Sequence, residues 1–360
     1  FFARHLKGAA DPASYREEPY EPLEDEELLV FLKEAITDPN RTYDEIPDSL
    51  HRPLPTEMDA AALKELLRDH WRGQLESYWP SDSESRTRFE DRYGTGYRHV
   101  LAAEVPEKTS VIERGTVAGP GFTARRLLIA REGRRDWIPA VLLQPKAATA
   151  SATLLLTPGG KRGALQRRRE NELTAEVRAL LDRGHAVLAI DPFGVGEHVL
   201  PEGTETPRNP STEHFTTFNR TQMQEQVQDV LTAASYLSDR PGVEDLSLLG
   251  LAESGHTALL AAPLAEDLID RTAAAGLDLP KIRSENETAP LRYFVPGLLR
   301  LGGLRTAAAL TAPHPLLLSG HLDRIAPDQV AEAYEISGAP SALRTEKAAS
   351  PEVLAEWLDR

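Results

Sequence analysis

The chain has 360 residues, 41% of them hydrophobic, so it can bury a substantial core in one large domain or two ordinary ones. Its 56 acidic residues outnumber 41 basic ones, and the formal net charge of −15 argues against a nucleic-acid or anionic-membrane partner. The lack of cysteine excludes disulfides and thiolate metal sites, and the sequence shows neither a membrane-spanning apolar run nor a signal peptide.

The first hundred residues are polar, acidic and interrupted by prolines. Leucines and aromatic residues recur there at helical spacing, which predicts two amphipathic helices over residues 24–36 and 59–78. The chain opens with Phe-Phe-Ala-Arg rather than methionine, so we expect a processed product or a fragment.

From about residue 110 the pattern changes. The aliphatic runs 122–130 and 137–144 flank a turn at 131–136 and predict a hairpin. Beyond it we expect strands at 152–157, 185–190, 246–250, 307–310, 315–318 and 342–345, and helices at 165–183, 221–237, 255–264, 327–336 and the end of the chain. Short apolar runs between helices indicate parallel strands covered on both faces, and therefore an α/β fold.

One strand-to-helix turn carries a motif of chemical interest. Residues 250–254 read Gly-Leu-Ala-Glu-Ser, which follows the G-x-S-x-G pattern with a small residue at each flank. In that pattern the central serine attacks a carbonyl from a strained turn. Ala252 occupies the central position here, and a methyl group cannot act as a nucleophile.

Several further landmarks occur in the order and spacing of a known family: 157–161 (Thr-Pro-Gly-Gly-Lys), 189–197, 218–221 and 318–323. With the turn at Ala252 they make residues 110–360 resemble the α/β hydrolases, and among them the esterases grouped with acetyl xylan esterases and dienelactone hydrolases. The resemblance implies a mostly parallel sheet with helices on both faces, preceded by an N-terminal helical extension. It also implies ester hydrolysis by a Ser-His-Asp triad without cofactor or metal, and it suggests a secreted or periplasmic location.

The resemblance assigns a role to particular residues. Asp323, after the seventh strand, takes the position of the triad acid. The oxyanion donors fall on the Glu253 N–H and on the loop Gly159-Gly160-Lys161. The base should be a histidine in the loop after the last strand, but residues 341–351 contain none and no histidine follows His321.

Each of these residues also has a structural interpretation. The glycines at 159 and 160 suit any tight turn, and Asp323 suits a cap for the helix near residue 327. Ser254 is either a relocated nucleophile or a helix cap. The bases available to it are His256, His314 and His321, and His198 and His214 lie in the long loop that in hydrolases lines the cleft. Histidines in such positions are more often structural, and no pair has the spacing of a zinc site.

Nucleophile and base are thus both missing from their places, which favours a degenerate site over a single designed Ala252 substitution. We expect a non-catalytic partner of a catalytic esterase domain that binds a carbohydrate or ester ligand. The alternatives are an active esterase with a relocated Ser/His pair and an engineered serine-to-alanine variant. Residues 1–12 resemble the closing helix of a preceding hydrolase domain. We therefore expect a second, tandem domain at 106–360 joined to it through a helical linker at 13–105.

Overall fold

A computed structural model describes residues 59–147, 150–166, 169–198, 214–278, 291–323 and 325–359, and four isolated positions before them (11, 21, 24 and 27). The chain divides into two compact units, Phe1–Glu65 and Leu66–Arg360, and the second contains the sheet described below. Among the described residues, no helix has the length and apolar character to cross a membrane. The predictions for residues 1–12 and for a helix at 24–36 concern positions that lie almost entirely outside the described residues.

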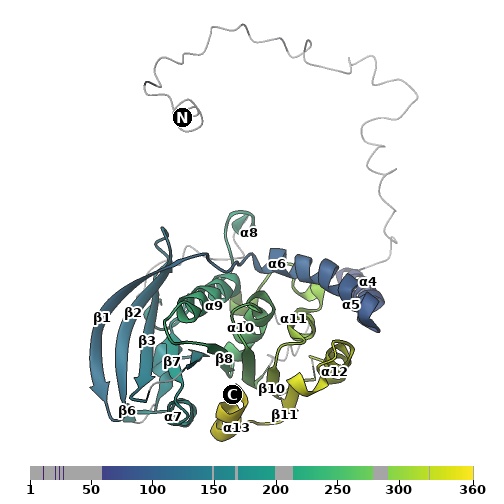
Figure 1. Cartoon of the computed structure of the whole chain (residues 1–360). Coiled ribbons are helices and arrows are strands. Elements are labelled where there is room, and N and C mark those ends of the chain that lie inside the picture. The colour runs from purple at the N-terminus through teal and green to yellow at the C-terminus, as the bar shows by residue number, and fades with distance from the viewer. Residues whose placement is uncertain are drawn as a thin grey trace, which may run out of the picture. The chain divides into compact units, whose positions relative to one another are not determined.

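The centre of the second unit is a sheet in which the described residues form nine strands (Figure 1). Their order across the sheet is β1-β2-β3-β7-β4-β8-β9-β10-β11. The strands are β1 (Thr109–Gly119), β2 (Phe122–Arg131), β3 (Ile138–Pro145), β4 (Ser151–Leu156), β7 (Ala186–Ile190), β8 (Asp245–Leu251), β9 (Arg271–Leu277), β10 (Leu316–Gly320) and β11 (Leu343–Glu346). The first three are antiparallel to their neighbours, and the run from β7 to β11 is parallel. The predicted hairpin and the predicted parallel sheet are both confirmed.

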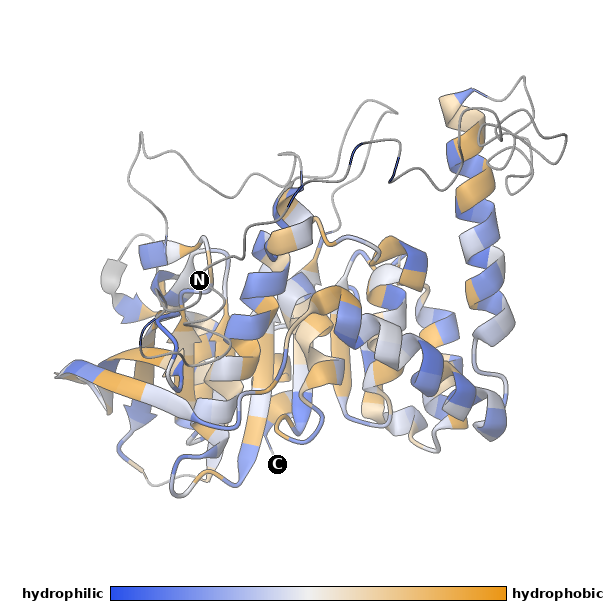
Figure 2. Cartoon of the chain, turned by 90° about the horizontal axis from the view of Figure 1, so that it is seen from above, coloured by the Kyte–Doolittle hydropathy of each residue, from blue (hydrophilic) through white to orange (hydrophobic). Residues whose placement is uncertain are grey.

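Along the parallel strands, successive apolar side chains point to alternate faces of the sheet, and both faces are buried. Leu154 and Leu156 belong to the larger apolar cluster, whereas Leu155 between them belongs to a second cluster. Successive strand side chains point to opposite faces, so an apolar residue at every position requires cover on both sides. In Figure 2 the strands in the middle of the body are accordingly coloured as mostly hydrophobic.

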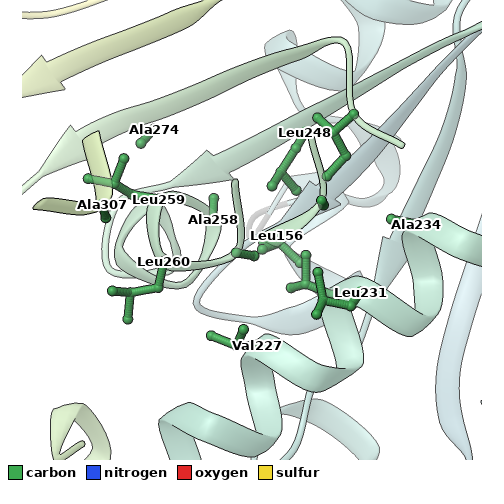
Figure 3. Packing of buried hydrophobic residues seen from close by; sticks show 14 of the residues in the cluster. Leu156, Val227, Leu231, Ala234, Leu248, Ala258, Leu259, Leu260, Ala274 and Ala307 are labelled. Carbon is green, nitrogen blue, oxygen red and sulfur yellow. The ribbon is translucent and has the colours of Figure 1, made fainter. Parts of the chain in front are cut away.

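Helices cover both faces. The larger cluster includes α9 (Gln222–Ser238), α10 (Ser254–Ala261), α11 (Gly303–Thr311) and α12 (Pro327–Ile336), and the smaller one includes α7 (Ala175–Asp182) and α13 (Pro351–Leu358). Figure 3 shows Leu231 of α9 beside the strand residue Leu156, and Leu259 of α10 beside Ala274 of β9 and Ala307 of α11. This packing fixes α9 and α10 against the strands from which the candidate site is built.

Helices before the sheet share the larger cluster. They are α4 (Ala60–Tyr78), α5 (Ser83–Phe89), the π-helix η3 (Glu90–Gly94) and α6 (Thr95–Leu101). Phe89, Tyr97 and Leu101 are fully buried within that cluster. The segment from Leu66 onward therefore contributes to the same core as the sheet.

Two predicted elements differ from the structure, and several elements were not predicted, among them the strands β1 and β9. Where a helix was predicted from residue 165, β5 (Leu165–Gln166) pairs antiparallel with β6 (Arg169–Leu173). The helix begins only after Thr174, whose side chain accepts a hydrogen bond from Val177 N. The predicted strand 307–310 lies inside α11, because alanine is the strongest helix former. The edge strand β1 is largely exposed and so lacks an apolar signal, and alanine-rich β9 has weak strand propensity but is buried between two strands.

Candidate functional site

The turn between β8 and α10 has the geometry of a nucleophile elbow. Ala252 has φ of 50°, in the left-handed region that non-glycine residues rarely adopt, and its N–H donates to the Ala275 carbonyl at 2.7 Å. Helix α10 starts two residues later. A sharp strand-to-helix turn with one strained central residue is what presents the reactive side chain in α/β hydrolases. The predicted elbow is present, with the methyl group of Ala252 exposed at its tip.

The small residues around the turn allow strand and helix to approach closely. A Cβ atom on Gly250 would lie 2.6 Å from the Ala258 Cβ and 2.8 Å from the Ser254 carbonyl oxygen. A Cβ on Gly255 would lie 2.8 Å from a methyl group of Leu277. The glycines are thus required by packing whether or not the turn carries a nucleophile.

Ser254 opens helix α10 and lines a pocket beside the elbow. It does not cap the helix, because Glu253 occupies the N-cap position and makes no side-chain capping hydrogen bond. The helix-cap interpretation of Ser254 is therefore wrong, and Ser254 is instead one of the residues that line the pocket.

Asp323 lies in the turn after β10 and is exposed. It is not a helix cap, since Ala326 is the N-cap residue of α12. Among the described residues, no hydrogen bond or ion pair joins Asp323 to a histidine. The nearby His321 instead approaches Asp278, with Nδ1 to Oδ1 at 3.7 Å and both side chains about three-quarters exposed.

His256 is buried beneath the elbow. Its ring is 2% exposed and meets the Tyr293 ring edge-on, with the centroids 5.2 Å apart. Neither ring nitrogen has a hydrogen-bond partner among the described residues. Burial lowers the pKa of His256, although Glu253 and Asp278 act to raise it and Arg292 reinforces the lowering. The structure brings His256 close to the site without placing it in a relay with Ser254 or Asp323.

The other candidate histidines lie elsewhere. His314 lies just before β10, at the amino ends of the strands. The adjacent Pro315 lines a second cavity there, of about 140 Å³. The expectation that His314 approaches the ligand crevice at the carboxyl ends of the strands is therefore wrong. The reason is that a parallel strand has its two ends on opposite edges of the sheet. His198 Nε2 lies 2.6 Å from the Trp137 carbonyl oxygen, and His214, with φ of 59°, immediately precedes the short helix α8 (Phe215–Phe218).

The loop predicted to supply oxyanion donors is tied to a buried carboxylate. The Gly160 N–H donates to the Thr157 carbonyl at 2.9 Å, and the Lys161 N–H donates to Asp191 Oδ1 at 2.7 Å. The Lys161 ammonium is paired with the same carboxylate and, at 3.0 Å, with Glu197. Both Gly160 and Lys161 N–H groups are therefore engaged within the protein.

Asp191 also holds the loop that follows β7. The Glu197 N–H donates to Asp191 Oδ2 at 2.9 Å. A Cβ atom on Gly160 or on Gly196, whose φ angles are 60° and 58°, would collide with the Asp191 carboxylate. One buried carboxylate thus clamps the loops that follow β4 and β7.

A pocket of about 220 Å³ opens beside the elbow at the carboxyl ends of these strands. The residues that line it come from β4 and the loop after it, the loop after β7, α9, α10 and the 3-10 turn η7 (Leu291–Tyr293): Leu156, Pro158, Pro192, Gly194, Val195, Gln222, Met223, Gln226, Glu253, Ser254, Thr257, Arg292 and Tyr293. Ligands of open α/β sheets bind at this edge.

One wall of the pocket is held by hydrogen bonds that are partly or fully buried. Gln226 Nε2 donates to the Phe193 carbonyl at 2.9 Å, and the Phe193 N–H donates to Asp229 Oδ2 at 2.7 Å. The Thr257 hydroxyl donates to Gln226 Oε1 at 3.3 Å, which links this wall to α10. Burial raises the pKa of the Asp229 carboxyl well above its usual value.

The sequence pointed to Glu253 and Ser254 but not to the other residues that line the pocket or support its wall. Gln222, Gln226 and Asp229 occupy successive turns of one face of α9, and a polar stripe on a buried helix is the signal that would have found them. Arg292 and Tyr293 lie in an irregular segment with no recognisable motif. Among the described residues, no cluster of three or more histidine, aspartate or glutamate side chains could hold a metal ion.

The fold is similar to that of solved esterases. A candidate acetyl xylan esterase from Bacteroides fragilis matches with a TM-score of 0.63 at 13% identity, over 82% of this chain and 84% of that one. A methylesterase matches with a TM-score of 0.55 at 16% identity, over 81% of this chain and 67% of the other. No protein-family model and no curated protein matches the sequence. At such identities the similarity shows that the chain shares the α/β-hydrolase-like fold of these esterases.

Proposed function

We propose that this chain is a carbohydrate-esterase-like domain that binds a carbohydrate or ester ligand without hydrolysing it. The observation that carries the proposal is Ala252: the elbow keeps its strained φ of 50° around a side chain with no reactive atom. No histidine follows His321 in the sequence, so the loop after β11 supplies no base. A serine hydroxyl needs such a base to attack an ester.

The pocket beside the elbow supports a binding role. Gln222 and Ser254 offer neutral hydrogen-bonding groups, and Tyr293 offers an aromatic ring. A concave site in which a few polar groups converge is the usual form of a small-molecule site. The names of the similar structures, an acetyl xylan esterase and a methylesterase, suggest ester-bearing ligands, including acetylated xylan fragments.

The proposed partner is a catalytic esterase domain that precedes this one in a tandem protein. Such a domain would supply the hydrolysis, and the chain described here would hold the ligand or support the fold of its neighbour. Co-expression of the two domains, followed by a comparison of the catalytic domain's kcat/KM with and without this chain, tests the partnership.

The rival function is ester hydrolysis by Ser254, which is favoured by one observation: Ser254 is among the residues that line the pocket. His256 is the base nearest to it in the sequence, but both ring nitrogens lack a hydrogen-bond partner among the described residues. A fluorophosphonate probe that labels Ser254, and loses its target in Ser254→Ala, would establish the rival and remove our proposal.

The direct test is hydrolysis of p-nitrophenyl acetate by the wild-type chain and by Ala252→Ser. We expect both to show only the background rate, because Ala252→Ser restores the hydroxyl without a base. Full activity of Ala252→Ser would instead mean that the rest of the machinery is intact and that only the nucleophile is missing. Titration of the wild-type chain with acetylated xylo-oligosaccharides by calorimetry tests binding separately.

A further inference from the structure

The two sides of the pocket are held very differently. The Phe193 side is fixed by the hydrogen bonds to Gln226 and Asp229, whose side chains are buried. On the other side, two consecutive residues of η7 meet the start of α10 through their side chains. Arg292 Nη2 lies 3.0 Å from Glu253 Oε1, and Tyr293 packs edge-on against His256.

The Glu253–Arg292 ion pair is weaker than the hydrogen bonds that hold the Phe193 side. Both Arg292 and Glu253 are half exposed, at 50% each, so water and salt compete for their charges. The guanidinium carbon of Arg292 also lies 5.0 Å from the Tyr293 ring centroid, which couples the ion pair to the ring contact. All three of these residues line the pocket.

The His256 side chain, which packs against Tyr293, gains no hydrogen bond from its burial. His256 is 2% exposed and its two ring nitrogens have no hydrogen-bond partner among the described residues. A buried polar group without a partner loses the hydrogen bonds that water would give it. Movement of Tyr293 away from the ring would let water reach these nitrogens, which lowers the cost of opening.

We propose that η7 is a strap over the mouth of the pocket, which opens when the Glu253–Arg292 pair and the His256–Tyr293 contact part together. In the closed form it narrows the pocket, and in the open form it admits a ligand and exposes His256 to solvent. The strap gives access to the crevice of the proposed function, but its test needs no ligand and does not depend on whether the chain hydrolyses esters.

The test uses the reactivity of histidine rings with diethyl pyrocarbonate, followed by peptide mass spectrometry on the whole chain at neutral pH. His256 reports opening of the strap, and His185, which is fully buried near the amino ends of the strands, reports general loosening. We expect Arg292→Ala to raise the modification rate of His256 by about two- to fivefold, the range set by one half-exposed ion pair. The rate at His185 should not change.

Further variants separate the strap from other causes. Glu253→Gln should raise the His256 rate as Arg292→Ala does, and Tyr293→Ala gives the rate of the fully uncovered ring. Arg344→Ala breaks another partly exposed ion pair, with Glu346 on β11, and serves as the matched control. Adding 1 M NaCl should raise the His256 rate in the wild type and have less effect in Arg292→Ala.

An unchanged His256 rate in both Arg292→Ala and Glu253→Gln would overturn the proposal. An equal increase at His256 and His185 would also overturn it, because it would mean global loosening rather than movement of η7.

Discussion

Ala252 holds a backbone conformation that its side chain does not favour. A left-handed φ in an alanine costs about 1–2 kcal/mol, which the surrounding structure must offset. The Ala252 N–H bond to the Ala275 carbonyl and the close packing around Gly250 supply that support. The same conformation would present a serine hydroxyl, so the turn has an architecture that suits a nucleophile although its central residue is alanine. The sequence identified the alanine at this position, whereas the structure was needed to show its left-handed φ.

Asp229 is the second residue whose surroundings set its chemistry. Because burial raises its pKa, the folded carboxyl holds a proton at pH values where the unfolded carboxyl, with a pKa of about 3.9, has lost it. The folded state then binds more protons than the unfolded state, so the free energy of unfolding should fall as the pH rises above about 4.

We therefore expect Asp229→Asn to stabilise the chain at pH 8, on the order of 1 kcal/mol, and to have little effect near pH 4. The amide oxygen can still accept the hydrogen bond from Phe193 N. Urea unfolding between pH 4 and pH 8 measures the difference. Asp239→Asn, at the exposed end of the same helix, is the control, and an equal pH dependence of the two variants would contradict the argument.

At the scale of elements, β8, the elbow and α10 form one packed unit. Its sequence pattern was sufficient to predict it because an apolar strand, closely spaced small residues and an alanine-rich helix are all local signals. The same local reasoning failed for residues 307–310 and for β9. Both are alanine-rich: residues 307–310 follow the helix propensity of alanine, whereas β9 is a strand in spite of it, because it is buried between two neighbouring strands.

Replacement of Gly250 tests the packing of this unit. We expect Gly250→Ala to destabilise the chain by about 2–3 kcal/mol, because the new methyl group would overlap Ala258 and the Ser254 carbonyl. Gly73→Ala is the matched control: it lies inside α4 with no atom within 4 Å of its Cβ position, and should stabilise the chain by about 1 kcal/mol. Thermal unfolding of the two variants measures both effects, and a neutral Gly250→Ala would show that the turn can move.

At the scale of the whole molecule, two of the described histidines are fully enclosed: His185 precedes the amino end of β7, and His256 lies in the first turn of α10. Burial lowers the pKa of both His185 and His256. Below about pH 6.5 the unfolded chain therefore binds more protons at these positions than the folded chain, and the free energy of unfolding should decrease as the pH falls.

His256→Phe should reduce this acid sensitivity, with a gain on the order of 1 kcal/mol at pH 5, because its ring makes no hydrogen bond that phenylalanine would lose. His185→Phe should instead destabilise the chain at neutral pH, since His185 Nδ1 is hydrogen-bonded to the Thr153 hydroxyl at 2.9 Å. His99→Phe, at an exposed position, is the control. Chemical denaturation at pH 5 and pH 7.5 distinguishes the three variants, and parallel pH curves for His256→Phe and the wild type would refute the assignment.

The sequence by itself determined the alternating α/β pattern, the hairpin that precedes it, the elbow, and the alanine that occupies the nucleophile position. These features are encoded in residue identity and short-range spacing. Only the tertiary structure decided which residues form the pocket, because the loop after β7, α9, α10 and η7 meet through packing between positions far apart in the chain. It also decided that His314 lies at the other edge of the sheet and that Asp191 clamps two loops, since both follow from strand direction and register rather than from local pattern.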